Sequence, residues 1–323
     1  MIGKRPILFA LTAIALSFPA PASAQRYPEK PIKLIVPFPP GGPMDTLARF
    51  MAQPLSERLG QSIVIENRPG AGATIGMRAV ATAAPDGYTL LFGSSGSLAV
   101  APALYGNLDY DPATSFTPVA PFSTLLQLMV VRLDIPANNV AEFVTYAKAR
   151  PKQLNHGAAL ATPPHLLSTL FKVKAGIDST YVPYKGSALA VSDLLGGATH
   201  WTIDGIPILA PLVKAGRLRP LAIASTQHWG EMPQIPTMAE AGYPDVALDA
   251  WTGVVAPAGT PPAVVSKLNA LINGGLQGDK VKDALAKLGA LPKPGSPAEF
   301  GAFIRAELPK WAYAVKIAGA KID

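Results

Sequence analysis

The residues of this 323-residue chain that could bind a small molecule lie in short segments rich in Gly, Pro and hydroxyl groups, each of which follows an apolar run. In the first, the β-branched run Ile32–Val36 breaks into a Pro/Gly loop that leads into a helical pattern. Backbone N–H groups at a helix start have no intrahelical partner, and the positive end of the helix dipole lies beside them. Residues 38–44 are therefore predicted to bind a small anion.

Hydroxyl side chains follow another apolar run, in the segment Gly-Ser-Ser-Gly-Ser at residues 93–97. A serine hydrolase places its nucleophile at the centre of Gly-x-Ser-x-Gly, but with Ser95 at the centre Ser97 occupies the position of the second glycine. None of the four histidines stands in an obvious pairing with an acid that would make it a general base. Hydrogen bonding of Ser94, Ser95 and Ser97 to a carboxylate is favoured over hydrolysis, and simple N-capping is an equal alternative.

Two other motifs each allow more than one interpretation. Gly70-x-Gly72-x-x-x-Gly76 is similar to a dinucleotide fingerprint, but the next apolar run does not end in the acid that would bind a ribose, so a tight turn is favoured. Asp204 ends an apolar run before a glycine, where it either accepts hydrogen bonds from a ligand or from an opposing lobe, or caps the next turn. No cluster of metal-ligating residues is present in the sequence, so we expect neither metal nor cofactor.

The first 24 residues have the features of a cleaved secretory signal. Lys4 and Arg5 precede an apolar stretch at residues 7–18, and Ala-Ser-Ala at residues 22–24 forms a peptidase site before Gln25. The apolar stretch is shorter than the roughly 20 residues of a membrane-spanning helix. We therefore expect export to the periplasm, with an uncleaved anchor as the alternative.

Charge and composition exclude several classes of function. The chain has 28 Lys and Arg against 21 Asp and Glu, a formal charge of +7 that becomes about +5 once the signal is removed. These basic residues are mostly isolated, without the dense runs or interleaved aromatics of a nucleic-acid-binding surface, so no nucleic-acid partner is expected. The sequence contains no cysteine, which excludes a disulfide, a thiolate nucleophile and a zinc–thiolate site.

The elements that must position these residues alternate between apolar strand-like runs and helical patterns, which predicts mainly parallel sheets covered by helices on both faces. Extended apolar segments near residues 119–132 and 246–257 interrupt the alternation. We therefore predict one α/β lobe from residues 25–122 and 249–323, and a second from residues 123–248 nested inside it. The two extended segments would form the hinge, with a ligand cleft between the lobes.

We make three predictions about helix ends in the C-terminal region. Thr260 is expected to cap a helix, and Ser296 and Glu299 to form a capping box at the start of the last one. Pro309 is expected to kink or end that last helix.

Six motifs, taken together, resemble one known family. They are YPEKPIKLIVPFPPGGPMDTLAR, VIENRPGAGATIG, APDGYTLLFGSSGSLA, PALYGNLDYDP, VPYKGSALAVSDLLGG and WTGVVAPAGTPPAVVSKLNA. In their order and spacing they resemble the Bug/TctC family of periplasmic solute-binding proteins of tripartite tricarboxylate transporters. The resemblance implies two doubly wound α/β lobes of the periplasmic-binding-protein type, joined by a two-strand hinge. It also implies a monomer that binds a small organic carboxylate and delivers it to a permease of one large and one small membrane subunit.

The resemblance also assigns ligand-binding positions, residue by residue. On the first lobe they are Phe38, Pro39, Gly41, Gly42, Met44, Ser94, Ser95 and Gly96. On the second lobe they are Ala159, Thr162, His165, Tyr184, Lys185, Gly186 and Asp204.

One loop departs from the family pattern. Residues 156–166 read HGAALATPPHL where the family has a small, polar and Gly-rich turn, so Ala158 lacks a hydroxyl and Leu160 introduces a branched apolar side chain. If Leu160 lines the pocket, the loop would favour a ligand with an apolar or aromatic body over a heavily hydroxylated acid. The leading hypothesis is a non-enzymatic binding protein that closes on its ligand by hinge motion. The alternatives are a receptor that presents its ligand to a sensor kinase and a secreted hydrolase using Ser95.

Overall fold

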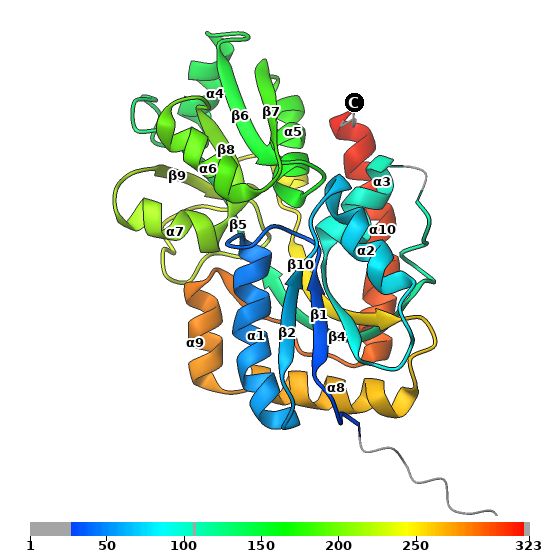
Figure 1. Cartoon of the computed structure of the whole chain (residues 1–323). Coiled ribbons are helices and arrows are strands. Elements are labelled where there is room, and N and C mark those ends of the chain that lie inside the picture. The colour runs from blue at the N-terminus through cyan, green and yellow to red at the C-terminus, as the bar shows by residue number, and fades with distance from the viewer. Residues whose placement is uncertain (1–26, 106–107, 320–323) are drawn as a thin grey trace, which may run out of the picture.

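The computed structural model describes residues 27–105 and 108–319, so the predicted signal peptide lies outside the described residues. Figure 1 shows two lobes, each built around its own twisted sheet. The chain leaves the first sheet after β4 (Phe116–Leu125), enters the second at β5 (Gln127–Val131), and returns at β10 (Ala250–Pro257). The predicted fold of two α/β lobes is confirmed.

The first lobe contains a six-stranded sheet in the order β11-β4-β10-β3-β1-β2. Its remaining strands are β1 (Ile32–Val36), β2 (Ile63–Asn67), β3 (Thr89–Ser94) and β11 (Ala290–Pro292). Its helices are α1 (Pro43–Leu59), α2 (Thr74–Ala81), α3 (Ala101–Tyr105), α8 (Pro262–Leu276), α9 (Asp279–Lys287) and α10 (Pro297–Ala318), with the short turns η1 (Ala71–Ala73) and η2 (Gly96–Val100). Buried side chains of α1 and α8 pack on one face of the sheet, and those of α2 and α10 on the other.

The second lobe contains a five-stranded sheet in the order β7-β6-β8-β5-β9. Its remaining strands are β6 (Leu154–Ala159), β7 (Ser179–Tyr184), β8 (Trp201–Gly205) and β9 (Arg219–Ile223). Its helices are α4 (Val140–Lys148), α5 (Pro163–Ala175), α6 (Ser187–Gly196) and α7 (Ile206–Lys214), with the turn η3 (Pro244–Val246). Phe143 and Phe171 each pack edge-on against Trp201, with ring centroids 5.6 Å apart, and anchor α4 and α5 on this sheet.

Strand direction differs from the prediction of mainly parallel sheets. In the first lobe β1 pairs in parallel with β2 and β3, but β10 pairs antiparallel with β3 and β4, and β11 antiparallel with β4. In the second lobe β5 is antiparallel to both β8 and β9. Parallel pairs arise where a helix carries the chain back over the sheet, whereas β4, β5 and β10 carry it between lobes and meet their neighbours without such a crossover.

The three C-terminal predictions have different outcomes. The capping box of Ser296 and Glu299 is confirmed. Thr260 does not cap, because α8 begins one residue later than expected, after Pro261, and the Thr260 hydroxyl donates to the Pro257 carbonyl instead. Helix α10 continues through Pro309 to its end, so the prediction of a helix end there is wrong. Burial of Trp311 and other apolar side chains beyond the proline offsets the lost hydrogen bond.

Candidate ligand-binding site

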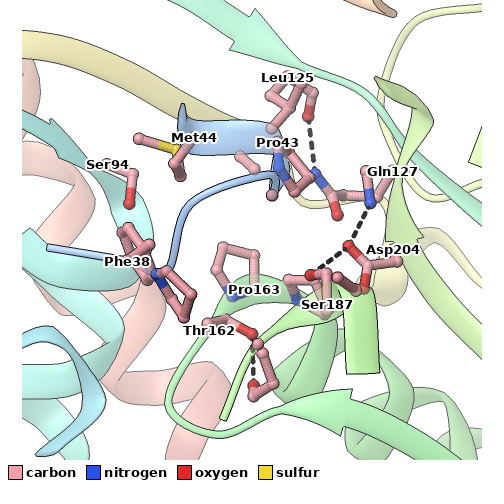
Figure 2. Close-up of a pocket in the computed structure, with 18 of the residues that line it drawn as sticks. Phe38, Pro43, Met44, Ser94, Leu125, Gln127, Thr162, Pro163, Ser187 and Asp204 are labelled. Carbon is pink, nitrogen blue, oxygen red and sulfur yellow. Dashed lines mark hydrogen bonds between the residues drawn. The ribbon is translucent and has the colours of Figure 1, made fainter. Parts of the chain in front are cut away.

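A cavity of about 350 Å³ lies between the two lobes, where the carboxyl-terminal ends of β1, β3, β6 and β8 meet the starts of several helices. Figure 2 shows the side chains that surround it. Ten of the residues predicted from the sequence line this cavity: Phe38, Pro39, Gly42, Met44, Ser94, Ser95, Ala159, Thr162, Gly186 and Asp204. The structure thus brings together two segments of the first lobe and three of the second. That these residues bind a ligand stays a prediction.

Five predicted residues lie outside the cavity lining. Gly41 has a φ of +79° and donates its N–H to Asp45 Oδ2, so it shapes the loop instead of facing the cavity. Lys185 is exposed. The Tyr184 hydroxyl donates to Asp193 in α6. The other two are Gly96, which packs against Pro163, and His165, whose ring is buried within the second lobe and stacks on Tyr181 at 4.3 Å.

The two departing residues of this loop lie outside the cavity lining, although Ala159, Pro163 and Pro164 of the same loop belong to it. Neither Ala158 nor Leu160 lines the cavity. The Leu160 N–H donates to the Tyr184 carbonyl, and the turn that follows is made by Ala161 with a φ of +57°, which fixes the loop backbone against its own lobe. The larger apolar side chains of the lining come from other segments and are Phe38, Met44, Leu125, Leu189 and Trp251.

Four α-helices begin at the cavity, and no side chain caps the first-turn N–H groups of any of them. The helices are α1, α5, α6 and α7, and the residues that precede them are Gly42, Thr162, Gly186 and Gly205. Thr162 precedes α5 but its side chain does not cap the helix, because its hydroxyl donates to the Ala159 carbonyl at 2.6 Å. All four residues line the cavity. Their helices therefore direct positive dipole ends toward it, which favours an anionic group on a ligand.

The loop that connects β1 to α1 is held by an ion-pair network that the sequence did not reveal. Asp45 Oδ2 accepts from the Gly41 N–H at 3.0 Å and from Arg49 Nε at 2.9 Å, and its Oδ1 accepts from Asn67 Nδ2 at 3.0 Å. Asn67 Nδ2 also donates to the Phe38 carbonyl. Burial opposes ionisation of Asp45, but these hydrogen bonds outweigh it and lower its pKa. The hydrogen bonds of Asp45 thus fix the shape of the predicted anion loop.

The serine segment forms hydrogen bonds within its own lobe. Ser97 Oγ accepts from the Ser94 N–H at 3.1 Å, and Ser95 Oγ accepts from the Trp251 N–H at 3.3 Å. No histidine is among the residues that line the cavity. Ser95 therefore has no general base in this site, within the residues that the structure describes.

Asp204 is the one ionisable side chain among the residues that line the cavity. It is 1% exposed, and its Oδ1 accepts from the Ser187 hydroxyl at 3.0 Å and from the Gly205 N–H at 2.7 Å. Burial raises the pKa of Asp204 to about 6 even though both hydrogen bonds favour the charged form. Both interpretations of Asp204 from the sequence are therefore compatible with its position, since it bonds the start of α6 and also faces the cavity.

Two polar residues of the lining were missed by the sequence predictions. Gln127 and Trp251 lie on β5 and β10, the strands that join the lobes, and both are almost fully buried. Gln127 interrupts an otherwise apolar run, TLLQLMVV, and a polar residue in a buried strand is a signal that could have identified it. Trp251 gives no comparable signal, since a tryptophan within an apolar run is normal for a core.

Within residues 27–105 and 108–319, no cluster of His, Asp and Glu is placed to hold a metal ion. Among those same residues, every helix is too short or too polar to cross a bilayer.

The chain matches known proteins over almost its whole length. The family described as "Tripartite tricarboxylate transporter family receptor" (TctC) matches residues 47–319. Protein BugT of Bordetella pertussis is 40% identical over 305 residues, which cover 94% of each chain. A solved structure of an R. palustris protein with adipate is 40% identical with a TM-score of 0.88, and covers 92% of this chain and 100% of that one. The periplasmic binding protein BugD is 35% identical with a TM-score of 0.86, over 91% of this chain and 99% of its own.

These matches confirm the resemblance seen in the six motifs. Members of this family are solute-binding receptors and not enzymes. The interlobe cavity, with its four uncapped helix starts, has the form that such a receptor requires. The chain belongs to the TctC family of tripartite tricarboxylate transporter receptors, the family of the Bug proteins.

Proposed function

We propose that this protein captures a small carboxylate-bearing organic solute between its lobes in the periplasm and delivers it to a tripartite membrane transporter. The observation that carries this proposal is the convergence of four uncapped helix starts on one interlobe cavity. No Lys, Arg or His is among the residues that line the cavity, so the helix starts are its principal source of positive potential.

The dimensions and walls of the cavity support a small organic acid. A volume of about 350 Å³ is at the small end of typical ligand sites. Aliphatic and aromatic side chains would contact the carbon skeleton, while the helix starts and Ser94 would bind the carboxylate. A similar protein was solved with adipate, a six-carbon acid that a cavity of this volume accommodates.

Contacts between the lobes support capture by closure. A Cβ built on Gly186 would lie 3.1 Å from Pro39 Cγ, and one built on Gly205 would lie 3.1 Å from Pro43 Cγ. In each contact a glycine of the second lobe faces a proline of the first. We propose that residues 25–122 and 249–323 move as one body against residues 123–248, and that these contacts form when the solute is enclosed.

Export and delivery are further parts of the proposal. We propose that the chain is cleaved after Ala24 and released into the periplasm, where a large and a small permease subunit receive the solute from the monomeric protein. Intact-mass measurement of periplasmic protein tests the export step. A chain that retains Met1 in the membrane fraction would contradict it.

A calorimetric and thermal-melting panel tests solute binding. The panel contains mono-, di- and tricarboxylates together with NAD and divalent metal ions. At 100 times its dissociation constant, a solute adds about 2.7 kcal/mol to the free energy of unfolding, which is readily visible as a higher melting temperature. Stabilisation by at least one carboxylate, and none by NAD or metals, is expected. Stabilisation by NAD alone would contradict the proposal and favour the dinucleotide interpretation of residues 70–76.

A further inference from the structure

Two side-chain oxygens at the second-lobe side of the cavity have no hydrogen-bond partner within the described residues. They are Gln127 Oε1 and Asp204 Oδ2, and each residue is 1% exposed. The two residues lie at the cavity end of adjacent antiparallel strands, where Gln127 is paired with Gly205 and Leu128 with Asp204. Their side chains therefore leave opposite faces of the sheet, and both residues line the cavity. Figure 2 shows both side chains at the same side of the cavity, beside Ser187. A buried acceptor without a partner is costly and requires an explanation.

The remaining polar atoms of both groups are already used, which fixes how the groups are presented. Gln127 Nε2 donates to the Leu125 carbonyl at 3.3 Å, so the amide oxygen is the atom left without a partner. Asp204 Oδ1 accepts from Ser187 and from the Gly205 N–H, so Oδ2 is the oxygen left over. Both orphaned atoms are acceptors, and neither group can turn to offer a donor without breaking an existing bond.

We propose that Gln127 and Asp204 form an acceptor pair that selects solutes carrying a hydrogen-bond donor, a hydroxyl or an amide N–H, at the end of the molecule opposite the carboxylate. This proposal rests on the proposed function and deepens it, because it names the class of carboxylate that the site prefers. A donor group of the solute that reaches either oxygen supplies the partner that this oxygen lacks. The helix starts bind the carboxylate at one end of the solute, and the acceptor pair accepts hydrogen bonds from the donor group at the other end.

The charges of the cavity favour this class over fully ionised dicarboxylates. A second carboxylate brings only acceptors, and no Lys, Arg or His in the lining compensates it beside Asp204. A plain alkyl acid avoids this repulsion but leaves both oxygens without a partner. The apolar wall accepts the carbon skeleton of all three classes, so the distal group decides between them.

Matched acids of equal chain length test the proposal by titration calorimetry at pH 8. The hydroxy acids are 4-hydroxybutanoate, 5-hydroxypentanoate and 6-hydroxyhexanoate, and each is compared with its plain alkyl acid and its dicarboxylate (succinate, glutarate and adipate). At the best chain length, the hydroxy acid is expected to bind at least about tenfold more tightly than both partners. Equal or tighter binding of the dicarboxylate would overturn the proposal.

Three variants connect this preference to the two residues. Asp204→Asn keeps an oxygen for Ser187 and Gly205 but turns the orphaned acceptor into an N–H donor, so the preference should shift by about tenfold or more toward the dicarboxylate. Gln127→Leu should reduce the advantage of the hydroxy acid over the alkyl acid. Asp178→Asn, an exposed change in the same lobe, is the matched control and should leave all ratios unchanged. Ratios that stay the same in Asp204→Asn would overturn the assignment.

The outcomes separate this inference from the proposed function. If no carboxylate of any class binds, the proposed function fails and the inference fails with it. If carboxylates bind but the distal group makes no difference, only the acceptor pair is refuted.

Discussion

At the scale of single residues, Asp204 is a costly feature of the structure, because it is buried with one oxygen unpaired. Because burial raises its folded-state pKa to about 6, above the usual value near 3.8, Asp204 binds its proton more tightly in the folded protein than in the unfolded chain. Folding is therefore favoured by this group at low pH, and the contribution is lost as the pH rises from about 4 to about 6. Loss of stability in a binding site is a common consequence of preparing groups for a ligand.

The first prediction follows from this fall in stability with rising pH. Asp204→Asn should raise the free energy of unfolding of the ligand-free protein at pH 7.5 by an amount on the order of 2 kcal/mol, and by much less at pH 4. The measurement is urea unfolding of both proteins across this range. His156 and His165, whose pKa values burial lowers to about 3 and about 4, impose an opposite trend in both proteins and cancel in the difference. A difference that does not change with pH would contradict the buried, partly unpaired state of Asp204.

The second prediction concerns Asp45, which fixes the loop before α1. Asp45→Ala removes the acceptor for Gly41, Arg49 and Asn67, and should lower the free energy of unfolding by about 2 to 3 kcal/mol and weaken solute binding. Chemical unfolding and calorimetry measure the two effects. Asp279→Ala, which removes an exposed aspartate at the start of α9, is the control and should change neither. Unchanged affinity in Asp45→Ala would mean that the loop does not contact the solute.

At the scale of elements, apposed glycines and prolines determine how closely the lobes approach. Gly186 precedes α6 and Gly205 ends β8, and neither has a positive φ, so both positions tolerate a side chain as far as the backbone is concerned. The space for that side chain is taken by Pro39 and Pro43 of the other lobe. The preference for glycine at these positions thus comes from the tight contact between lobes and not from the local conformation.

The third prediction tests whether the contact between lobes at Gly186 and Gly205 accompanies solute binding. The double variant Gly186→Ala, Gly205→Ala should hold the lobes slightly apart and weaken solute binding by about tenfold, since an added methyl in a packed contact costs about 1 to 3 kcal/mol. Stability without solute should change little. Gly196→Ala in α6 is the matched control, because a Cβ there meets nothing within 4 Å. Calorimetry and urea unfolding measure the two quantities, and equal affinity of the double variant would show that these contacts do not accompany binding.

Much of this architecture could be predicted from the sequence, and the exceptions have physical causes. The alternation of strand and helix patterns in the sequence predicted the two α/β lobes, because the spacing of apolar residues indicates which face of each element is buried. Strand direction in β4, β5 and β10 was not predicted, because it depends on the path between lobes and not on any local pattern. The direction of the Leu160 side chain depends on the turn at Ala161, whose positive φ is unusual for alanine. Gln127 and Trp251 lie far in sequence from the Gly/Pro loops and reach the cavity through strand pairing.

At the scale of the whole molecule, the proposed function requires the two lobes and the strands between them to convert solute binding into a change of shape. A solute in the cavity would contact both lobes, since the lining comes from both of them, and only a closed arrangement would offer all of these contacts together. A solute therefore stabilises closure by the difference between its affinities for the closed and open forms.

The fourth prediction is a change of overall size on binding. Saturation with the best acid of the panel should decrease the radius of gyration measured by small-angle X-ray scattering, and the Gly186→Ala, Gly205→Ala variant should show a smaller decrease. A radius that is equal with and without solute in the wild-type protein would contradict closure on binding.

The most direct test of a carboxylate held between the lobes is a crystal structure of the protein with the tightest-binding acid of the panel. The expected result is one solute in the interlobe cavity, with carboxylate oxygens within about 3.2 Å of backbone N–H groups at the starts of α1, α5, α6 or α7. A carboxylate bound elsewhere on the molecule, or bound in the cavity by Asp204 and Gln127 with the helix starts left in contact with water, would contradict the central claim.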